Sequence, residues 1–198
     1  MNFAIVVVSN VLIFIQAHYF GYSMIDLLTV YLLEVPLILL FSCVKTAKID
    51  GGSGFMLGFL VTVVNGIFLF LGFLAVKYIA CMQHSEMIVD FDQCPSIVQL
   101  ISDVAHLEYM IAGFCIIQII GLLNFFYKKE FNKLEVFDLI KFNSFRSVTV
   151  VITCSILGSV LSRYGDIEST AILWIFIVIK LVLDVFQAFG ERRKLVGR

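Results

Sequence analysis

Long apolar stretches separated by short polar segments dominate this chain. A helix needs about 20 apolar residues to cross ~30 Å of hydrocarbon. Stretches of roughly that length run from Phe3 to Phe20, Met24 to Cys43, Phe55 to Ala80, His106 to Tyr127 and Ala171 to Phe189. A shorter one, from Ser147 to Ser162, is rich in Ser and Thr. The pattern predicts an all-α, polytopic bundle of about six transmembrane helices, with four or five spans as the alternative.

The composition agrees with a protein that folds in lipid. Of 198 residues, 61% are hydrophobic and 15% charged, and the mean hydropathy is +1.02. Soluble domains average about 45–50% apolar and about 25% charged residues. We therefore predict one transmembrane domain over residues 1–198. The first stretch has no Lys or Arg and contains Asn10 and Gln16, which favours a retained span; a signal segment cleaved near Ala17 is the alternative.

The basic residues predict how the chain is oriented, because Lys and Arg favour cytoplasmic loops. They gather after the second span, in an inner loop at residues 128–146 and in a tail at residues 191–198. The opposite side offers Lys77 and Arg163, and its outer loop at residues 81–105 is acidic. Both termini are therefore expected in the cytoplasm, which agrees with an even number of spans.

The inner loop and the tail form the expected partner-binding region. Between residues 131 and 142, apolar side chains alternate with lysines at helix-like spacing, as in a helix that lies on the membrane surface. A docking surface for a soluble cytoplasmic protein would have the same pattern, so both interpretations stay open. The residues assigned to partner binding are Lys128, Lys129, Lys133, Lys141, Arg146, Arg192 and Arg193.

Polar side chains inside the apolar stretches form the candidate intramembrane site. Glu34 lies near the middle of the second stretch, where an ionisable group costs about 2.5–3.5 kcal/mol unless it faces protein or water. Lys180 lies at a comparable depth, and Asp184 follows at the i+4 spacing that places both on one helix face. Glu34 and Lys180 are candidate partners, and we expect Pro36 to kink the helix beside Glu34. The other polar residues expected at this level are Asn10, Asn65, Gln118 and Thr153.

This polar set has three interpretations. Interhelical hydrogen bonds commonly hold membrane bundles together, which favours a structural network. Opposite charges at mid-membrane are also typical of a substrate or ion site in small transporters. In the third interpretation, Lys180 pairs with Asp184 alone, within its own helix.

Small residues at four-residue spacing indicate close helix packing. Gly54 and Gly58 form one such pair, and Ser155 with Ser159 forms another. These pairs suit packing within one chain or between copies, and we expect a homo-oligomer.

Two of the five cysteines bracket the outer loop, and a disulfide between Cys81 and Cys94 is expected if that loop faces an oxidising periplasm. Pro95, next to Cys94, is expected to begin a short amphipathic helix. The chain has no metal-ligand spacing, nucleophile motif or P-loop. We therefore expect a non-enzymatic protein with no metal or cofactor and no direct nucleic acid binding.

Several blocks resemble, in order, a bacterial family of multi-pass inner-membrane proteins of unknown function. The most specific blocks are "YLLEV" with Tyr31 and Glu34, "FRSVTVV" with Arg146, and "IVIKLVLDVF" with Lys180 and Asp184. The resemblance covers nearly the whole chain. It implies a location in the bacterial inner (cytoplasmic) membrane and supplies no activity.

The expected function is a sensor or scaffold that couples a membrane or periplasmic event to a cytoplasmic partner. Small multi-span subunits of anti-phage defence systems, such as KwaA of Kiwa, are of this kind in class and size. A small transporter or channel with a Glu34 and Lys180 site is the alternative.

Overall fold

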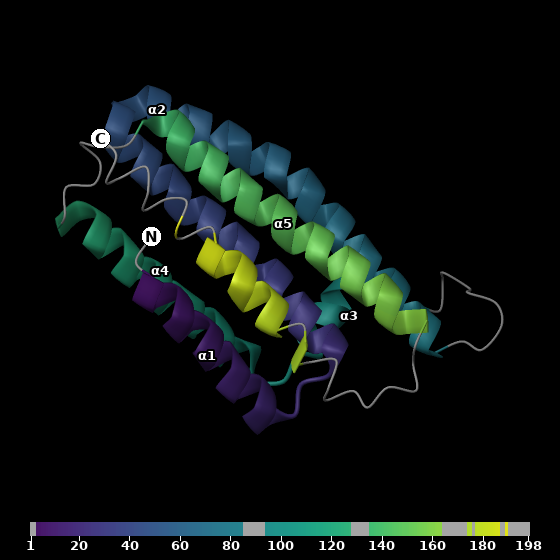
Figure 1. The fold of residues 1–198 in the computed structure, drawn as a ribbon. Helices are drawn as coiled ribbons and strands as arrows, with labels where there is room; N and C mark the ends of the chain where they lie inside the picture. Colours follow the sequence, from purple (N-terminus) through teal and green to yellow (C-terminus); the bar gives the residue numbers. More distant parts are fainter. Residues whose placement is uncertain are drawn as a thin grey trace.

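The computed structural model describes residues 3–84, 94–127, 135–163, 174–175, 177–186 and 189. Its elements are α1 (Phe3–Phe20), α2 (Met24–His84), α3 (Ile97–Ser102), α4 (Leu107–Tyr127) and α5 (Val136–Arg163), followed by a helical segment at residues 177–186. Every element within these residues is a helix (Figure 1), which confirms the all-α class. Helix α1 has the bounds predicted for the first apolar stretch, and α4 begins one residue later than the stretch predicted from His106.

Helix α2 consists of two arms that fold back on each other (Figure 1). The first arm (residues 24–49) and the second arm (residues 52–84) meet at Asp50 and Gly51, whose backbone angles are not helical. Gly51 has φ 59° and ψ -136°, a conformation that residues with a Cβ avoid. Ser53 Oγ donates to the carbonyl of Asp50 at 2.8 Å and holds the turn. The turn therefore lies at the first glycine of "GGSG", and helix resumes directly after it.

The two arms approach most closely near this turn. A Cβ added to Gly54 would collide with the carbonyl oxygen of Thr46, and one added to Gly58 would collide with the Thr46 hydroxyl. The small-residue spacing of Gly54 and Gly58 therefore serves packing inside one chain.

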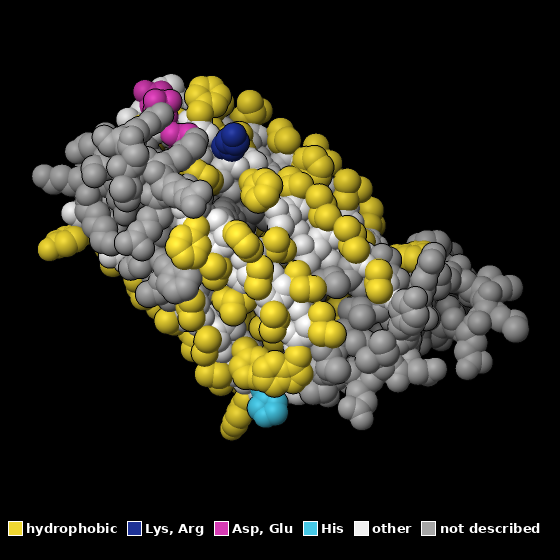
Figure 2. Space-filling model, viewed as in Figure 1, with side chains coloured by type: hydrophobic (Ala, Val, Ile, Leu, Met, Phe, Trp, Pro, Cys, Tyr) yellow, Lys and Arg dark blue, Asp and Glu magenta, His cyan; other side chains and the backbone are white. Residues whose placement is uncertain are grey.

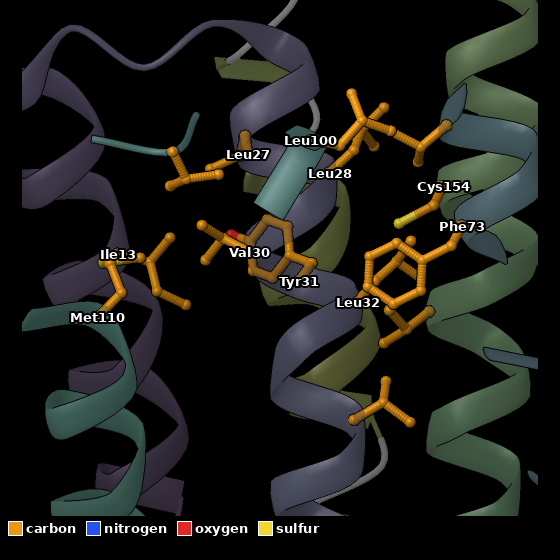
Figure 3. Close-up of a cluster of buried hydrophobic side chains, with 14 of the residues drawn as sticks. Ile13, Leu27, Leu28, Val30, Tyr31, Leu32, Phe73, Leu100, Met110 and Cys154 are labelled. Atoms are coloured by element: carbon orange, nitrogen blue, oxygen red, sulfur yellow. The ribbon is translucent and has the colours of Figure 1, made fainter. Parts of the chain in front are cut away.

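The first arm is the central helix of the bundle. Six consecutive residues, 27 to 32, are 0% exposed, so this part of the arm is covered on all sides. Figure 3 shows Ile13 and Met110, from α1 and α4, on one side of it, and Phe73 and Cys154, from the second arm and α5, on the other. A side chain between residues 27 and 32 is therefore in the interior wherever it points, whereas Leu40 and Val44, farther along the arm, are exposed.

The outer surface is suited to lipid. Three helices are long and apolar enough to cross a membrane, and they include both arms of α2, α4 and the part of α5 up to Ile156. Hydrophobic side chains cover the middle of the face in Figure 2, and the charged and histidine side chains drawn there lie toward the ends. Such continuous apolar surface is foreign to soluble monomers. These properties identify a membrane protein with transmembrane helices.

One local prediction differs from the structure. Helix α5 begins at Val136, so the apolar and basic pattern of residues 136–142 is the first part of this long helix instead of a separate surface helix. Val136 and Leu139 are buried, which shows that this part of α5 packs on protein. Pro36 lies inside the first arm of α2, and the helix continues through it with helical backbone angles, so the kink expected there stays a prediction.

Candidate functional site

Five polar or aromatic side chains meet inside the bundle and are called here the charged cluster: Asn10, Tyr31, Glu34, Lys180 and Asp184. Glu34 lies ten residues after Met24, the first residue of α2, and Asn10 lies ten residues before Phe20, the last residue of α1. Ten helical residues span about 15 Å, half of the ~30 Å hydrocarbon thickness. Asn10 and Glu34 therefore lie at the same distance from the turn that joins the two helices, a distance equal to half of the hydrocarbon thickness.

Lys180 is the centre of the cluster. Its Nζ lies 2.7 Å from Asp184 Oδ2, one helical turn away, and 3.1 Å from Glu34 Oε2 on the first arm. The predicted pairing with Glu34 and the i+4 pairing with Asp184 are therefore both present. Two carboxylates from different segments share one ammonium group.

Asn10 and Tyr31 complete the surroundings of Lys180. Asn10 Nδ2 donates to Asp184 Oδ2 at 3.0 Å, and its Oδ1 accepts from Lys180 Nζ at 3.4 Å. The ammonium also lies 4.5 Å from the centre of the Tyr31 ring, a cation–π contact. The cluster thereby joins α1, the first arm of α2 and residues 177–186.

The cluster is closed to the outside. Glu34 is 1%, Asn10 2%, Asp184 3% and Lys180 4% exposed, and Tyr31 is completely buried. Buried charges of this kind are strongly held only while their partners stay in place, because removal of one partner leaves the other desolvated. The cluster can therefore lock the last helical segment to the first two helices.

Asn65 and Gln118 do not join the charged cluster. Asn65 is buried and donates to the carbonyl of Val61 at 2.8 Å and to Ser144 Oγ at 3.2 Å. It belongs to a second set of contacts, in which Asn143 Nδ2 also donates to Ser42 Oγ at 2.6 Å. This set ties α5 to both arms of α2. Gln118 is half-buried on α4 and has no hydrogen bond to the cluster.

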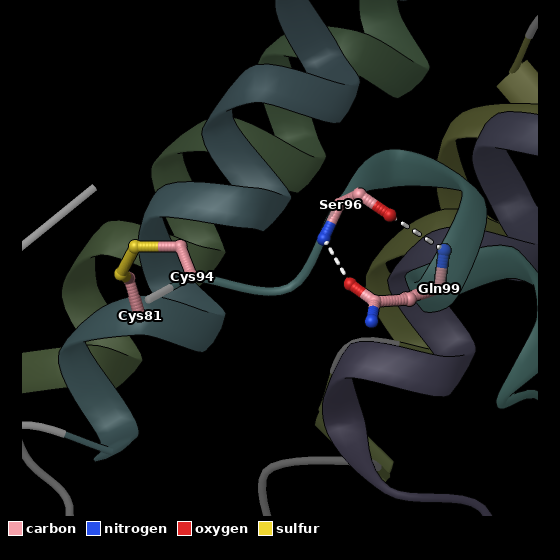
Figure 4. Close-up of a disulfide and its surroundings, with 4 residues drawn as sticks. All are labelled: Cys81, Cys94, Ser96 and Gln99. Atoms are coloured by element: carbon pink, nitrogen blue, oxygen red, sulfur yellow. Dashed lines mark hydrogen bonds between the residues drawn. A yellow bond between two sulfur atoms is a disulfide. The ribbon is translucent and has the colours of Figure 1, made fainter. Parts of the chain in front are cut away.

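At the end of the bundle near the α1–α2 turn, a disulfide bond and a helix cap hold the chain in place. Cys81 at the end of the second arm is bonded to Cys94, with their Cα atoms 5.2 Å apart (Figure 4). Ser96 and Gln99 then form a reciprocal capping box at the start of α3. The expected helix after Pro95 is thus present, and its Leu100 packs into the core.

Tyr22 ties the α1–α2 turn to the segment before α4. Its hydroxyl donates to the carbonyl of Ala105 at 2.7 Å, and Phe20 packs on the His106 ring at 4.5 Å. Burial, together with the carboxylates of Asp26 and Glu108, raises the pKa of Tyr22 above its ordinary value. Tyr22 therefore remains a hydrogen-bond donor throughout the physiological pH range.

The residues predicted to bind a partner lie mostly outside the described residues. Lys128, Lys129, Lys133, Arg192 and Arg193 fall in segments that are not described, and of Arg146 only its place in α5 is described. Lys141 is exposed on α5.

Sequence reasoning named the three charged residues of the cluster and expected Asn10 at their depth, but it did not place Tyr31 in the site. Asn10 had a usable signal, since it is a lone amide in an apolar helix, and Tyr31 lies one turn before Glu34. Among the residues that the structure describes, no group of three or more His, Cys, Asp or Glu could hold a metal ion.

No curated protein and no solved structure matches this chain. One family model does match, over residues 1–196, and it therefore includes every residue of the charged cluster. The chain belongs to the family of unknown function DUF6498.

Proposed function

We propose that this chain is a non-enzymatic sensor or scaffold of the bacterial inner membrane, which passes a membrane or periplasmic event to a soluble cytoplasmic partner. In this proposal the chain has six spans and both termini in the cytoplasm, and it works as a homo-oligomer. A membrane subunit of an anti-phage defence system is the setting we favour. The observation that carries the proposal is the charged cluster.

The cluster suits a coupling role because it connects segments that are far apart in the sequence. Lys180 and Asp184 lie on residues 177–186, while Asn10 and Glu34 lie on α1 and α2. The basic tail at residues 191–198 follows this last segment directly. A change in the bundle that weakens the contacts of Lys180 would therefore shift the segment that carries the tail.

The disulfide supports the proposed orientation. Disulfides form and persist in oxidising compartments such as the periplasm. The bond between Cys81 and Cys94 lies at the α1–α2 turn end of the bundle. The opposite end, where Lys45 and Lys48 lie, would then face the cytoplasm, in agreement with the preference of basic residues for that side.

The test is partner recruitment by full-length protein in membranes. We expect a triple variant, Lys141→Gln with Arg192→Gln and Arg193→Gln, to insert normally and to lose both recruitment of the cytoplasmic partner and the cellular phenotype. The matched control is Lys77→Gln, which removes a charge near the other end of the second arm and should change neither. Unchanged recruitment by the triple variant would refute the proposal.

A small transporter or channel is the second candidate. The ion pair of Glu34 with Lys180, at 3.1 Å and at mid-membrane depth, favours it. Because these side chains are at most 4% exposed, transport would require a second, open conformation. In proteoliposomes, Glu34→Gln and Lys180→Met should abolish flux while Lys141→Met should not. Absence of flux in the unaltered protein would remove this candidate.

A further inference from the structure

We infer that the disulfide between Cys81 and Cys94 is a site of thiol–disulfide exchange, at which a dithiol reductant frees α3 from the core of the bundle. The inference rests on the proposed function, because it names the periplasmic event that the sensor detects. The reductant is identified by its chemistry: it is a pair of thiols that becomes a disulfide when it reacts.

Helix α3 covers one end of the hydrophobic core. Leu100 is 6% exposed and lies in the same core cluster as Leu27 and Leu28 of the first arm (Figure 3). Val104, just after the helix, is 4% exposed in the same cluster. The opposite face of α3 points outward, since Val98 is 76% exposed. Displacement of α3 would therefore uncover a part of the first arm that is 0% exposed at residues 27 and 28.

The disulfide fixes the beginning of α3 to the second arm. The helix has six residues, and an isolated helix of that length is not stable in water. Its capping box joins Ser96 to Gln99 within the same short segment (Figure 4). Cys94 lies two residues before Ser96, and its bond to Cys81 closes a sequence separation of 13. Once the bond opens, that end of α3 is free to move over the length of the released chain.

The other end of α3 stays attached when the disulfide opens. The Tyr22 hydroxyl donates to the carbonyl of Ala105 at 2.7 Å, three residues after Ser102, the last residue of α3. This hydrogen bond contains no sulfur and is unaffected by a reductant. Reduction therefore produces a hinged movement, which is largest at the Cys94 end of α3 and smallest at Ala105.

The part of the first arm below α3 leads to the charged cluster. Tyr31 follows Leu27 by one helical turn, and its ring centre lies 4.5 Å from Lys180 Nζ. Loss of the cover on Leu27 and Leu28 would weaken the restraint on this turn of the helix. The movement of α3 would thus reach Lys180, whose segment precedes the basic tail.

The exchange takes two displacements at sulfur. Cys94 is half-buried and Cys81 is 6% exposed, so a thiolate of the reductant attacks the Cys94 sulfur. The bond between the two cysteines breaks, and Cys81 leaves as a thiolate and takes up a proton. The second thiolate of the reductant then attacks the mixed disulfide and releases Cys94, which also takes up a proton. Two electrons and two protons pass from the dithiol to the protein, and the reductant is left as a disulfide.

The test is reduction of the full-length protein in lipid nanodiscs, with dithiothreitol as a small dithiol and reduced thioredoxin as a protein dithiol. Mass spectrometry measures the gain of two hydrogens, and hydrogen–deuterium exchange measures the opening of residues 96–104. We expect reduction to speed exchange there by at least about tenfold, because a disulfide typically favours its closed loop by more than that factor. Reduction by dithiothreitol alone would identify the reductant as a small dithiol, and reduction by both would identify a protein dithiol.

The variants separate the disulfide from the other cysteines. Cys81→Ser combined with Cys94→Ser should exchange as fast as the reduced protein and should not respond to reductant. The matched control is Cys115→Ser, which removes a free cysteine from α4 and should keep the full response. Oxidised and reduced protein should also differ in recruitment of the cytoplasmic partner, a readout that a purely structural disulfide would leave unchanged.

Three results would overturn the inference: reduction of the folded protein by neither dithiol, unchanged exchange of residues 96–104 after reduction, or equal recruitment by the oxidised and reduced forms. If the double serine variant does not fold, reduction of wild-type protein that has already folded provides the decision. The proposed function fails separately, through unchanged recruitment by the tail variants. Lost recruitment in those variants, with equal recruitment by oxidised and reduced protein, would leave the sensor intact and remove only its thiol signal.

Discussion

At the scale of single residues, Lys180 is the side chain on which the charged cluster depends most. It contacts Glu34, Asp184, Asn10 and the Tyr31 ring. Lys180→Met would leave two carboxylates buried beside each other without their shared cation. Loss of one partner of a buried ion pair typically costs about 3–5 kcal/mol. We expect a loss of this size in the free energy of unfolding, measured by denaturant titration in detergent micelles.

Two further variants make this prediction specific. Lys141→Met removes an exposed lysine from α5 and should change stability by less than about 0.5 kcal/mol. Adding Glu34→Gln and Asp184→Asn to Lys180→Met should restore much of the lost stability, because no unpaired charge then remains in the core. A triple variant no more stable than Lys180→Met alone would contradict the assigned role of the charges.

Tyr22 provides a prediction outside the membrane spans. Tyr22→Phe removes the hydrogen bond to Ala105, which we expect to cost about 1 kcal/mol at neutral pH. Because burial and the nearby carboxylates raise the pKa of Tyr22 in the folded state, the folded chain binds this proton more tightly than the unfolded chain. That stabilisation is complete below the unfolded pKa of about 10 and is lost as the pH rises through the folded value.

The unaltered protein should therefore lose stability at alkaline pH more steeply than Tyr22→Phe does. Thermal unfolding followed by circular dichroism, at neutral and alkaline pH, measures both parts of the prediction. Tyr19→Phe is the control, since Tyr19 is 81% exposed and should leave the pH dependence unchanged. Equal alkaline slopes for the unaltered protein and Tyr22→Phe would show that Tyr22 does not contribute.

The residue scale also shows what the sequence could predict about the site. A carboxylate and an ammonium in apolar stretches must each find a partner, so the pairing of Glu34 with Lys180 followed from cost alone. The positions of Asn10 and Tyr31 depend on how α1 and α2 rotate against each other, which periodicity does not specify for helices that are apolar all round. Asn65 was assigned to the same level for that reason, although it contacts Ser144 of α5 instead.

At the scale of elements, the two arms of α2 provide the clearest test of packing. In Gly54→Ala the new Cβ meets the carbonyl oxygen of Thr46, which belongs to helix backbone and cannot rotate away. Overpacking of this kind typically costs about 1–3 kcal/mol. Gly66→Ala on the same arm is the control: nothing lies within 4 Å of its added Cβ, so it should be neutral or slightly stabilising. Equal stability of the two variants would mean that the arms do not touch at Gly54.

The element boundaries show where sequence patterns stop being informative. The end of α1 at Phe20 could be predicted because a glycine, Gly21, follows the apolar stretch, and glycine commonly ends helices. In the structure, Gly21 adopts φ 66° and Tyr22 N donates to the Ala17 carbonyl. The start of α5 at Val136 could not be predicted, because a pattern of apolar and basic residues suits both a helix on the membrane surface and the end of a membrane-spanning helix. Val136 and Leu139 are buried, so packing decided between the two.

At the scale of the whole molecule, the arrangement of the second arm leads to a prediction about topology. This arm runs from the turn at Gly51 to the disulfide at Cys81, and at 1.5 Å per residue its length exceeds the ~30 Å of hydrocarbon. We therefore expect its two ends to lie on opposite sides of the membrane. In the proposed bacterial inner membrane, the disulfide would place the Cys81 end in the oxidising periplasm.

Labelling of single cysteines with a membrane-impermeant maleimide tests this topology, in a chain that keeps the disulfide and has Cys43, Cys115 and Cys154 replaced. Val98 is 76% exposed on α3, so Val98→Cys should react in intact bacterial cells. Ser53, beside the turn between the arms, is exposed at the other end, so Ser53→Cys should react only after the cells are permeabilised. Reaction of both positions from the same side would mean that the second arm does not cross, and an even number of spans with cytoplasmic termini would then be untenable.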